Sequence, residues 1–312
     1  MDIKPFTVSL RPAVLDDLRE RLENTRWPDE VPGAGWDYGT SLRYMRALID
    51  YWHEDFDWPA QERALNAFPH FLAEVDGQAI HFIHVRGRGP QPMPIIITHG
   101  WPSSFVEMLK LIPLLADPGA HGGDPADAFD VVVPSLPGFG FSQPRTARGP
   151  ARTHEIWRRL MVDGLGYPRF AAQGGDVGAR VTSALGRAYP DSLIGLHLST
   201  VDLDWPTPMP AESELSDAEK DYLARVEHWD DTEGGYRHIQ ATRPQSLAYG
   251  LNDSPAGLAA WIVEKWQAWS DCGGDPDNSF SQDELLTNIT LYWATQTINS
   301  SMRYYYERRH DP

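Results

Sequence analysis

A short glycine-rich segment, Gly174-Gly175-Asp176-Val177-Gly178, imposes the tightest local geometry in this sequence. It has the form Gly-x-Asp-x-Gly, with apolar Phe170-Ala171-Ala172 before it and a helical pattern after it. This layout is typical of a nucleophile elbow, the sharp strand-to-helix turn that raises one side chain above a parallel sheet. Glycines flank the central residue because a neighbouring Cβ would clash in so tight a turn. The segment therefore predicts a buried strand, a turn that presents Asp176, and a helix.

The central residue decides which chemistry such an elbow supports. The position usually carries serine, whereas this sequence carries Asp176. A carboxylate attacks an alkyl carbon and forms an ester, so this exchange indicates covalent chemistry at carbon. A glycine-rich turn with a solvated aspartate fits the same residues, and the rest of the chain must decide between the two interpretations.

Short apolar runs predict the sheet around this elbow. Besides the strand before Asp176, strands are expected at residues 71–75, 79–85, 95–98, 129–133 and 194–198. Asp76-Gly77, between the first two runs, is a strong two-residue hairpin signal. The later runs alternate with helical patterns and end in Gly/Pro-rich loops, which is typical of a doubly wound, mostly parallel α/β sheet. Ligands of such sheets bind beyond the carboxyl ends of the strands, where these loops gather.

Helical patterns flank the strand region on both sides. Helices are expected at residues 13–23, 42–51 and 57–65 before it, and at 217–229 and 258–269 after it. Residues 1–70 show no strand signal and predict an N-terminal helical region. Residues 71–201 predict the sheet core. Residues 202–312 predict a tryptophan-rich helical lid.

Charge and cysteine content disfavour several classes of function. The net charge of 27 − 44 = −17 argues against nucleic acid or an anionic membrane surface as a partner. One cysteine, Cys272, permits no internal disulfide, and nothing indicates a metal site or a cofactor. The N-terminus lacks the pattern of a signal peptide, and no apolar run approaches the roughly 18 residues that a membrane span needs. The composition predicts a soluble, cytoplasmic protein.

Motifs from nearly the whole chain point to one family. The N-terminal region carries Leu15-Asp16-Asp17-Leu18, Thr25-Arg26-Trp27-Pro28, Tyr51-Trp52 and Phe56-Asp57-Trp58. The core carries His99-Gly100-Trp101-Pro102 and the Asp176 elbow, and the lid region carries Gly235-Tyr236-Arg237-His238-Ile239-Gln240, Leu251-Asn252-Asp253-Ser254-Pro255 and Arg303-Tyr304-Tyr305-Tyr306-Glu307. In this order the motifs resemble the microsomal-type epoxide hydrolases, α/β hydrolases with an extended N-terminal helical region. The resemblance implies the α/β-hydrolase fold with a helical lid insertion.

The resemblance also implies roles for individual residues. Asp176 would open an epoxide by attacking a ring carbon, giving an alkyl-enzyme ester on the way to a vicinal diol. Tyr236 and Tyr305 match the family's lid tyrosines and would donate hydrogen bonds to the departing oxygen. The backbone N–H groups of Trp101 and Val177 would form the oxyanion hole. We expect the two hydroxyls to converge over Asp176 on the side opposite Trp101.

Aromatic side chains suggest the substrate class. Phe139, Trp101 and the lid tryptophans favour a small-molecule epoxide that is apolar, with aromatic epoxides among the candidates. Tyr304 and Tyr306 adjoin Tyr305, so an assignment shifted by one residue would leave the mechanism unchanged.

The sequence departs from the family pattern at its carboxyl end. In the family, the histidine and carboxylate that activate the hydrolytic water lie beyond the Arg-Tyr-Tyr segment, near the last two core strands. This sequence ends at His310-Asp311-Pro312, and neither His99, His154 nor His238 occupies the expected position. We therefore expect a sheet without those C-terminal strands and no histidine within reach of Asp176. The open sheet edge would favour a homodimer.

Two alternatives to an epoxide hydrolase stay open. A haloalkane dehalogenase also uses an aspartate nucleophile in this fold, but it needs halide-binding donors such as indole N–H groups. The match of Tyr236 and Tyr305 argues against it. A catalytically incomplete, ligand-binding α/β-hydrolase homologue would keep the pocket and lack the water-activating base.

Overall fold

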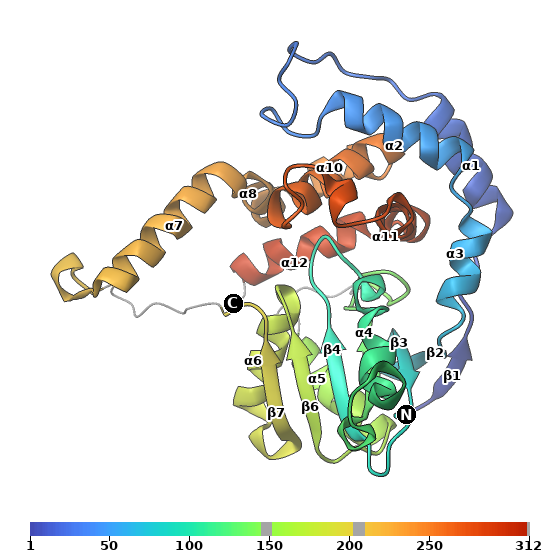
Figure 1. Cartoon of the computed structure of the whole chain (residues 1–312), viewed down its shortest axis with the longest axis vertical. Helices are drawn as coiled ribbons and strands as arrows, with labels where there is room; N and C mark the ends of the chain where they lie inside the picture. The colour runs from blue at the N-terminus through green and yellow to red at the C-terminus, as the bar shows by residue number, and fades with distance from the viewer. Residues whose placement is uncertain (145–151, 202–209, 311–312) are drawn as a thin grey trace.

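The computed structural model describes residues 1–144, 152–201 and 210–310 and places a layer of helices across one end of a twisted sheet (Figure 1). Residue 202, where the lid was expected to begin, lies outside the described residues, as does the Asp311-Pro312 end of the chain. The carboxyl ends of the parallel strands point toward the helical layer (Figure 1), so the loops that follow these strands meet the lid.

Seven strands form the sheet in the described part of the chain, in the order β1-β2-β3-β5-β4-β6-β7. Their bounds are β1 (Ile3–Phe6), β2 (His70–Val75), β3 (Gln78–Val85), β4 (Met93–Thr98), β5 (Phe129–Pro134), β6 (Phe170–Gly174) and β7 (Leu193–Leu198). Strands β5, β4, β6 and β7 run parallel, whereas β1, β2 and β3 pair antiparallel and β3 also pairs antiparallel with β5. The predicted mostly parallel α/β sheet is confirmed.

The side chains of the central strands explain this arrangement. Ile96 and Val132 belong to the apolar core on one face of the sheet, while Ile97 and Val133 belong to the core on the other face. Strands that are apolar on both faces need cover on both sides, as a doubly wound sheet provides. The hairpin between β2 and β3 is also as predicted. Both of its turn residues, Asp76 and Gly77, have a positive φ, 53° and 74°.

The expectation that residues 1–70 contain no strand is wrong. Residues Ile3–Phe6 form β1, which pairs antiparallel with β2 at the edge of the sheet. Pro5 hid this strand in the sequence, because proline lacks the N–H that a central strand must donate. An edge strand tolerates it, because one side of the strand has no ladder partner.

Helices cover the sheet and form the layer above it. They are α1 (Pro12–Glu23), α2 (Leu42–Glu54), α3 (Trp58–Leu65), α4 (Leu111–Ala116), α5 (Thr153–Arg159), α6 (Val177–Ala188), α7 (Asp217–Glu233), α8 (Gly235–Thr242), α9 (Pro244–Leu251), α10 (Pro255–Trp269), α11 (Gln282–Thr295) and α12 (Ile298–His310). Among the helices described, none is both long and apolar enough to cross a membrane.

The N-terminal helices brace the helical layer. The buried Trp52 indole on α2 donates a 3.1 Å hydrogen bond to the Thr290 hydroxyl on α11. The Arg21 guanidinium on α1 donates to the backbone oxygen of Asp253, just before α10, at 2.7 Å. Because these contacts join segments more than 200 residues apart, the N-terminal region fixes the helices above the sheet instead of forming a separate unit.

Candidate active site

Asp176 lies at a strained turn between β6 and α6. Its backbone has φ 48° and ψ −120°, a combination that a side-chain-bearing residue adopts only at a cost. The flanking glycines make the turn possible. A Cβ on Gly174 would lie 2.1 Å from the Gly178 oxygen, and a Cβ on Gly178 would lie 2.1 Å from the Thr98 oxygen. Close backbone packing therefore requires both glycines and presents Asp176 at the end of β6.

The Asp176 carboxylate lies between two cavities. One, of about 570 Å³, is lined by residues that include Trp101, Trp266 and Phe280. The other, of about 550 Å³, is lined by residues that include Tyr236 and Tyr305. Asp176 borders both cavities, so a molecule held in either one can meet its carboxylate.

The loop after β4 holds a backbone donor against this carboxylate. The Trp101 N–H donates to Oδ1 of Asp176 at 2.9 Å. Helix α11 anchors the loop, because the Asn288 amide donates to the Pro102 oxygen at 2.9 Å and the Tyr292 hydroxyl donates to the Ser103 oxygen at 2.8 Å, both in buried positions. The Trp101 donor is therefore fixed before any ligand binds.

Val177, the other expected N–H donor, begins α6 and lines the 550 Å³ cavity. The first N–H groups of a helix have no intrahelical acceptor, and the helix dipole makes this end favourable for negative charge. Both expected donor residues thus adjoin Asp176, one in the loop after β4 and one at the start of α6.

The lid tyrosines meet beside Trp101. Tyr236 on α8 and Tyr305 on α12 have ring centroids 5.8 Å apart in an edge-to-face arrangement. The Tyr236 ring stacks on the Trp101 indole, with centroids 5.1 Å apart and planes inclined by 3°, and Tyr305 meets the same indole edge-on at 5.9 Å. The expectation that the tyrosines lie opposite Trp101 is wrong, because all three rings form one aromatic cluster above the nucleophile turn.

Both phenols remain protonated near neutral pH. Burial, assisted by the negative charge of Asp176, raises the pKa of Tyr236 to about 12. The same two causes raise the pKa of Tyr305 well above its ordinary value. The buried Tyr305 hydroxyl lies close to the Tyr236 side chain but makes no hydrogen bond of ordinary geometry among the described residues. A buried hydroxyl without such a bond is costly, so it is suited to donate to an incoming ligand oxygen.

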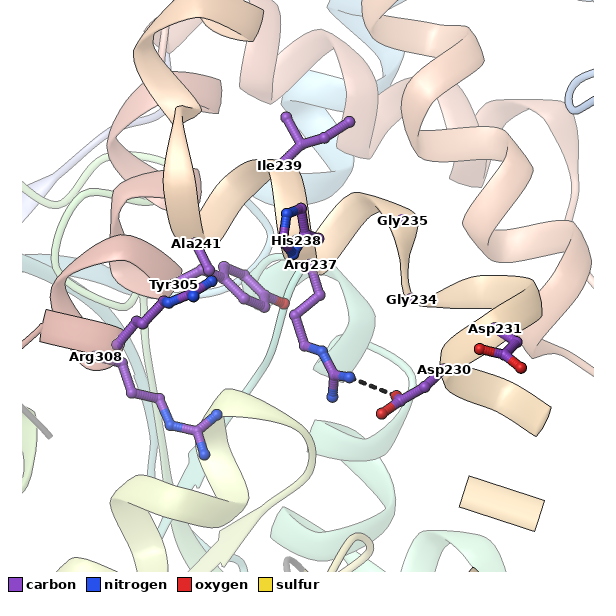
Figure 2. Close-up of a pocket in the computed structure, with 11 residues that line it drawn as sticks. Asp230, Asp231, Gly234, Gly235, Arg237, His238, Ile239, Ala241, Tyr305 and Arg308 are labelled. Atoms are coloured by element: carbon purple, nitrogen blue, oxygen red, sulfur yellow. Dashed lines mark hydrogen bonds and ion pairs between the residues drawn. The ribbon is translucent and has the colours of Figure 1, made fainter. Parts of the chain in front are cut away.

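The neighbours of Tyr305 differ in position. Tyr304 lines the same 550 Å³ cavity, whereas Tyr306 stacks on His310 with ring centroids 4.0 Å apart. Tyr305 also borders a third cavity, of about 960 Å³, between α8 and α12. Figure 2 shows Arg237, one of the residues that line this cavity, paired with Asp230, and Tyr305 near the Arg237 side chain.

Phe139 does not line either cavity beside Asp176, in contrast to the prediction from the sequence. Its side chain is buried and packs edge-on against His99, at 5.3 Å, and Tyr292, at 6.4 Å. Gly138 and Gly140, with φ of 83° and 51°, turn the loop around it. Through its contact with His99, Phe139 therefore supports the loop that carries Trp101.

Sequence reasoning missed several lining residues of the 570 Å³ cavity. Lys265, Trp266 and Trp269 come from α10, and Phe280 comes from the loop before α11. The tryptophans were assigned only collectively to the lid, and helical periodicity does not reveal which of them reach the cavity.

Among the residues that the structure describes, neither His99, His154 nor His238 is placed to act as a base beside Asp176. His99 lines the 570 Å³ cavity, but its Nδ1 lies 3.0 Å from the Gly100 oxygen and its Nε2 accepts from the Leu136 N–H at 3.1 Å. Burial lowers the pKa of His99 to about 4, so it is neutral and structural. His154 and His238 border neither cavity beside Asp176. No group of three or more metal-ligating side chains occurs among the described residues.

Two family models match the chain. One, described as the epoxide hydrolase N terminus, matches residues 3–108, and one for the alpha/beta hydrolase fold matches residues 93–233. Epoxide hydrolase 1 of Oryctolagus cuniculus is 37% identical over 98% of this chain and 72% of its own length. A Stigmatella aurantiaca protein is 47% identical over 98% of this chain and 69% of its own length.

Solved structures give the same similarity in three dimensions. The Aspergillus niger epoxide hydrolase matches with a TM-score of 0.85 and 30% identity, over 99% of this chain and 79% of that one. The juvenile hormone epoxide hydrolase of the silkworm Bombyx mori matches with a TM-score of 0.81 and 31% identity, over 99% of this chain and 77% of that one.

Proposed function

The chain belongs to the epoxide hydrolase family and has the α/β-hydrolase fold, and from this premise we propose that Asp176 is the nucleophile that opens the epoxide ring. The observation that carries the proposal is the position of its carboxylate, which accepts from a fixed backbone donor and borders the cavity that the two protonated lid phenols also line. In this arrangement the carboxylate can attack a ring carbon, and the phenols can donate to the epoxide oxygen as negative charge develops on it.

In the first step, one oxygen of the Asp176 carboxylate forms a bond to a ring carbon as the bond from that carbon to the epoxide oxygen breaks. The product is an alkyl ester, with negative charge on the released oxygen. Tyr236 and Tyr305 donate to that oxygen as the charge develops, and one of them supplies its proton. Their raised pKa values support this role, because a phenol must keep its proton until the ring opens.

In the second step, water attacks the ester carbonyl and releases the vicinal diol. The N–H groups of Trp101 and Val177 stabilise the tetrahedral oxyanion on Asp176. The hydrogen bond from Trp101 to the Asp176 carboxylate and the position of Val177 at the start of α6 support this role. We assign no described residue to water activation, because both nitrogens of His99 are engaged in the fold.

The cavity walls favour an apolar substrate. Trp101, Trp266, Trp269 and Phe280 border the 570 Å³ space beside Asp176, and such walls favour an apolar or aromatic epoxide. The two phenols argue against a haloalkane as the substrate, because a departing oxygen needs a proton donor and a departing halide does not.

Two further assignments complete the proposal. Strand β7 pairs only with β6 among the described strands, and Ile194 and Leu196 on it are 43% and 48% exposed. An open strand edge with apolar side chains favours a homodimer through β7. The net charge of −17 disfavours anionic membrane surfaces and supports a cytoplasmic location, which cell fractionation tests.

Replacement of the nucleophile tests the proposal. Asp176→Asn keeps the shape of the side chain but removes the charged oxygen, so consumption of an apolar epoxide such as styrene oxide should stop. Chiral gas chromatography of remaining epoxide and diol measures the effect against the unmodified chain. Epoxide consumption that persists in Asp176→Asn would remove Asp176 from the reaction. An unmodified chain that binds the epoxide without consuming it would favour a ligand-binding role.

A further inference from the structure

A buried lysine lies in the lid above the nucleophile turn. Lys265 on α10 is only 6% exposed and borders the 570 Å³ cavity that Asp176 also lines. Its neighbours on the buried face of α10 are apolar, among them Leu258 and Ile262. Burying an ammonium group is expensive unless its charge is compensated. The Lys265 charge must therefore be stabilised by neighbouring groups, and its position beside the cavity suggests a role there.

Aromatic rings and one carboxylate stabilise the Lys265 ammonium. Its Nζ lies 5.4 Å from the ring centroid of Tyr236 and 5.6 Å from those of Trp261 and Trp269. A cation within about 6 Å of an aromatic face is attracted by the electron-rich centre of the ring. Glu264, the preceding residue, forms an ion pair with the same ammonium. Lys265 is thus held in a cage of three rings that is closed on one side by a carboxylate.

One wall of this cage is also part of the candidate active site. The Tyr236 ring contacts Lys265 and stacks on the Trp101 indole, and the Trp101 backbone N–H donates to Asp176. Direct contacts therefore run from the buried ammonium through Tyr236 to the loop that holds the nucleophile. A positive charge over a phenol ring withdraws electron density from it, so the phenol O–H becomes a better donor to a forming alkoxide.

We propose that Lys265 is a positioning residue for ring opening, acting through Tyr236: its ammonium holds the Tyr236 ring in place and strengthens the donor. The inference rests on the proposed roles of Asp176 and Tyr236. Lys265 itself touches the phenol ring, not the reacting atoms. Its contribution is confined to formation of the Asp176 ester, when negative charge appears on the epoxide oxygen.

Neutral and charged replacements separate charge from packing. Lys265→Met keeps most of the apolar stem and removes the charge, whereas Lys265→Arg keeps a cation. Lys220→Met, at an exposed position on α7, is the matched control. The rate at which the covalent adduct forms on the 312-residue chain is measured in single-turnover reactions with styrene oxide, by rapid quenching and intact mass spectrometry. Thermal unfolding of each variant is recorded in parallel.

Loss of the cation should slow adduct formation about three- to thirtyfold, the range that a desolvated cation–π contact supports. The styrene oxide concentration at half-maximal rate should stay within about twofold, because Lys265 acts on the chemical step. Lys265→Arg should restore the rate to within about threefold, and Lys220→Met should equal the unmodified chain. In a Tyr236→Phe background, Lys265→Met should cost less than about twofold, because the residue through which it acts has lost its hydroxyl.

Several outcomes overturn the proposal. An unchanged rate in Lys265→Met removes the charge from the mechanism. An equal loss in the Tyr236→Phe background shows that Lys265 does not act through Tyr236. If Lys265→Arg is as slow as Lys265→Met and both unfold at lower temperature, the lysine is only structural. If Lys265→Met does not fold, Lys265→Gln takes its place as the neutral variant. If the unmodified chain forms no adduct, the proposed function fails first and this inference fails with it.

Discussion

Gly100 provides a steric test of how the site is built. A Cβ at this position would lie 2.5 Å from both Cβ and Oδ1 of Asp176. Atoms that are not bonded to each other settle at about 3.5 Å, so Gly100→Ala leaves an overlap of about 1 Å. Either the Asp176 side chain or the Gly100–Trp101 backbone must move by about that distance, and either movement disturbs the 2.9 Å bond from the Trp101 N–H.

The magnitude follows from this displacement. A misplacement of about 1 Å in a catalytic group costs about a hundredfold in rate, or about 2.7 kcal/mol of barrier. Overpacking in a rigid site costs about 1–3 kcal/mol of folding free energy. We therefore expect Gly100→Ala to form the Asp176 adduct about a hundredfold more slowly, with a modest loss in urea unfolding.

A matched glycine controls for the substitution itself. Within the described part of the chain, an added Cβ on Gly250, inside α9, would meet no heavy atom within 4 Å outside its own helix backbone and chain neighbours, and its φ is not positive. Gly250→Ala should leave adduct formation unchanged and raise the unfolding free energy by up to about 1 kcal/mol. The steric reasoning is refuted if folded Gly100→Ala forms the adduct within twofold of the unmodified rate.

Four further outcomes are expected. Tyr236→Phe and Tyr305→Phe should each slow adduct formation about ten- to a hundredfold in rapid-quench assays, since each removes one donor; unchanged rates in both would exclude the phenols. With the pKa of Tyr236 raised to about 12, adduct formation should stay level from about pH 7 to 10, and a fall with a midpoint inside that range would contradict its protonated role. Burial lowers the pKa of His99 to about 4, so the neutral side chain contributes fully to the free energy of unfolding above about pH 6.5, and up to about 3 kcal/mol of it is lost as the pH falls toward 4. Urea titrations measure this loss, and equal free energies of unfolding at pH 7.5 and pH 5 would contradict it. Leu196→Lys on the open β7 edge should convert dimer to monomer in light scattering, and a dimer that persists would place the interface elsewhere.

Local patterns in the sequence predicted most of the fold. The buried strands show as apolar runs, and Asp76-Gly77 predicts a hairpin because both residues tolerate a positive φ. The Gly-x-Asp-x-Gly segment predicts the turn at Asp176, because close backbone packing excludes any Cβ at the flanking glycine positions. Strand Ile3–Phe6 was not predicted, because it contains Pro5 and proline argues against a strand unless that strand is known to lie at the edge of a sheet.

Contacts between segments that lie far apart in the sequence could not be predicted from local patterns. The stack of Tyr236 on Trp101 joins residues more than 130 positions apart, and no periodicity reports on it. Phe139 was assigned to the cavity from its neighbourhood in sequence, but the turn at its flanking glycines directs it into the core. Lys265 was missed because a lysine in a helix is usually solvated, and burial depends on what the rest of the chain packs against it.

The central claim is that the Asp176 carboxylate forms a covalent ester with the substrate. The direct measurement is tandem mass spectrometry of proteolytic peptides after rapid acid quenching of the 312-residue chain with styrene oxide. After the quench, the mass of one substrate should map to the peptide that contains Asp176 and be missing in Asp176→Asn. A modified peptide that lacks Asp176, or substrate turned over with no covalent adduct at any quench time, would contradict the account.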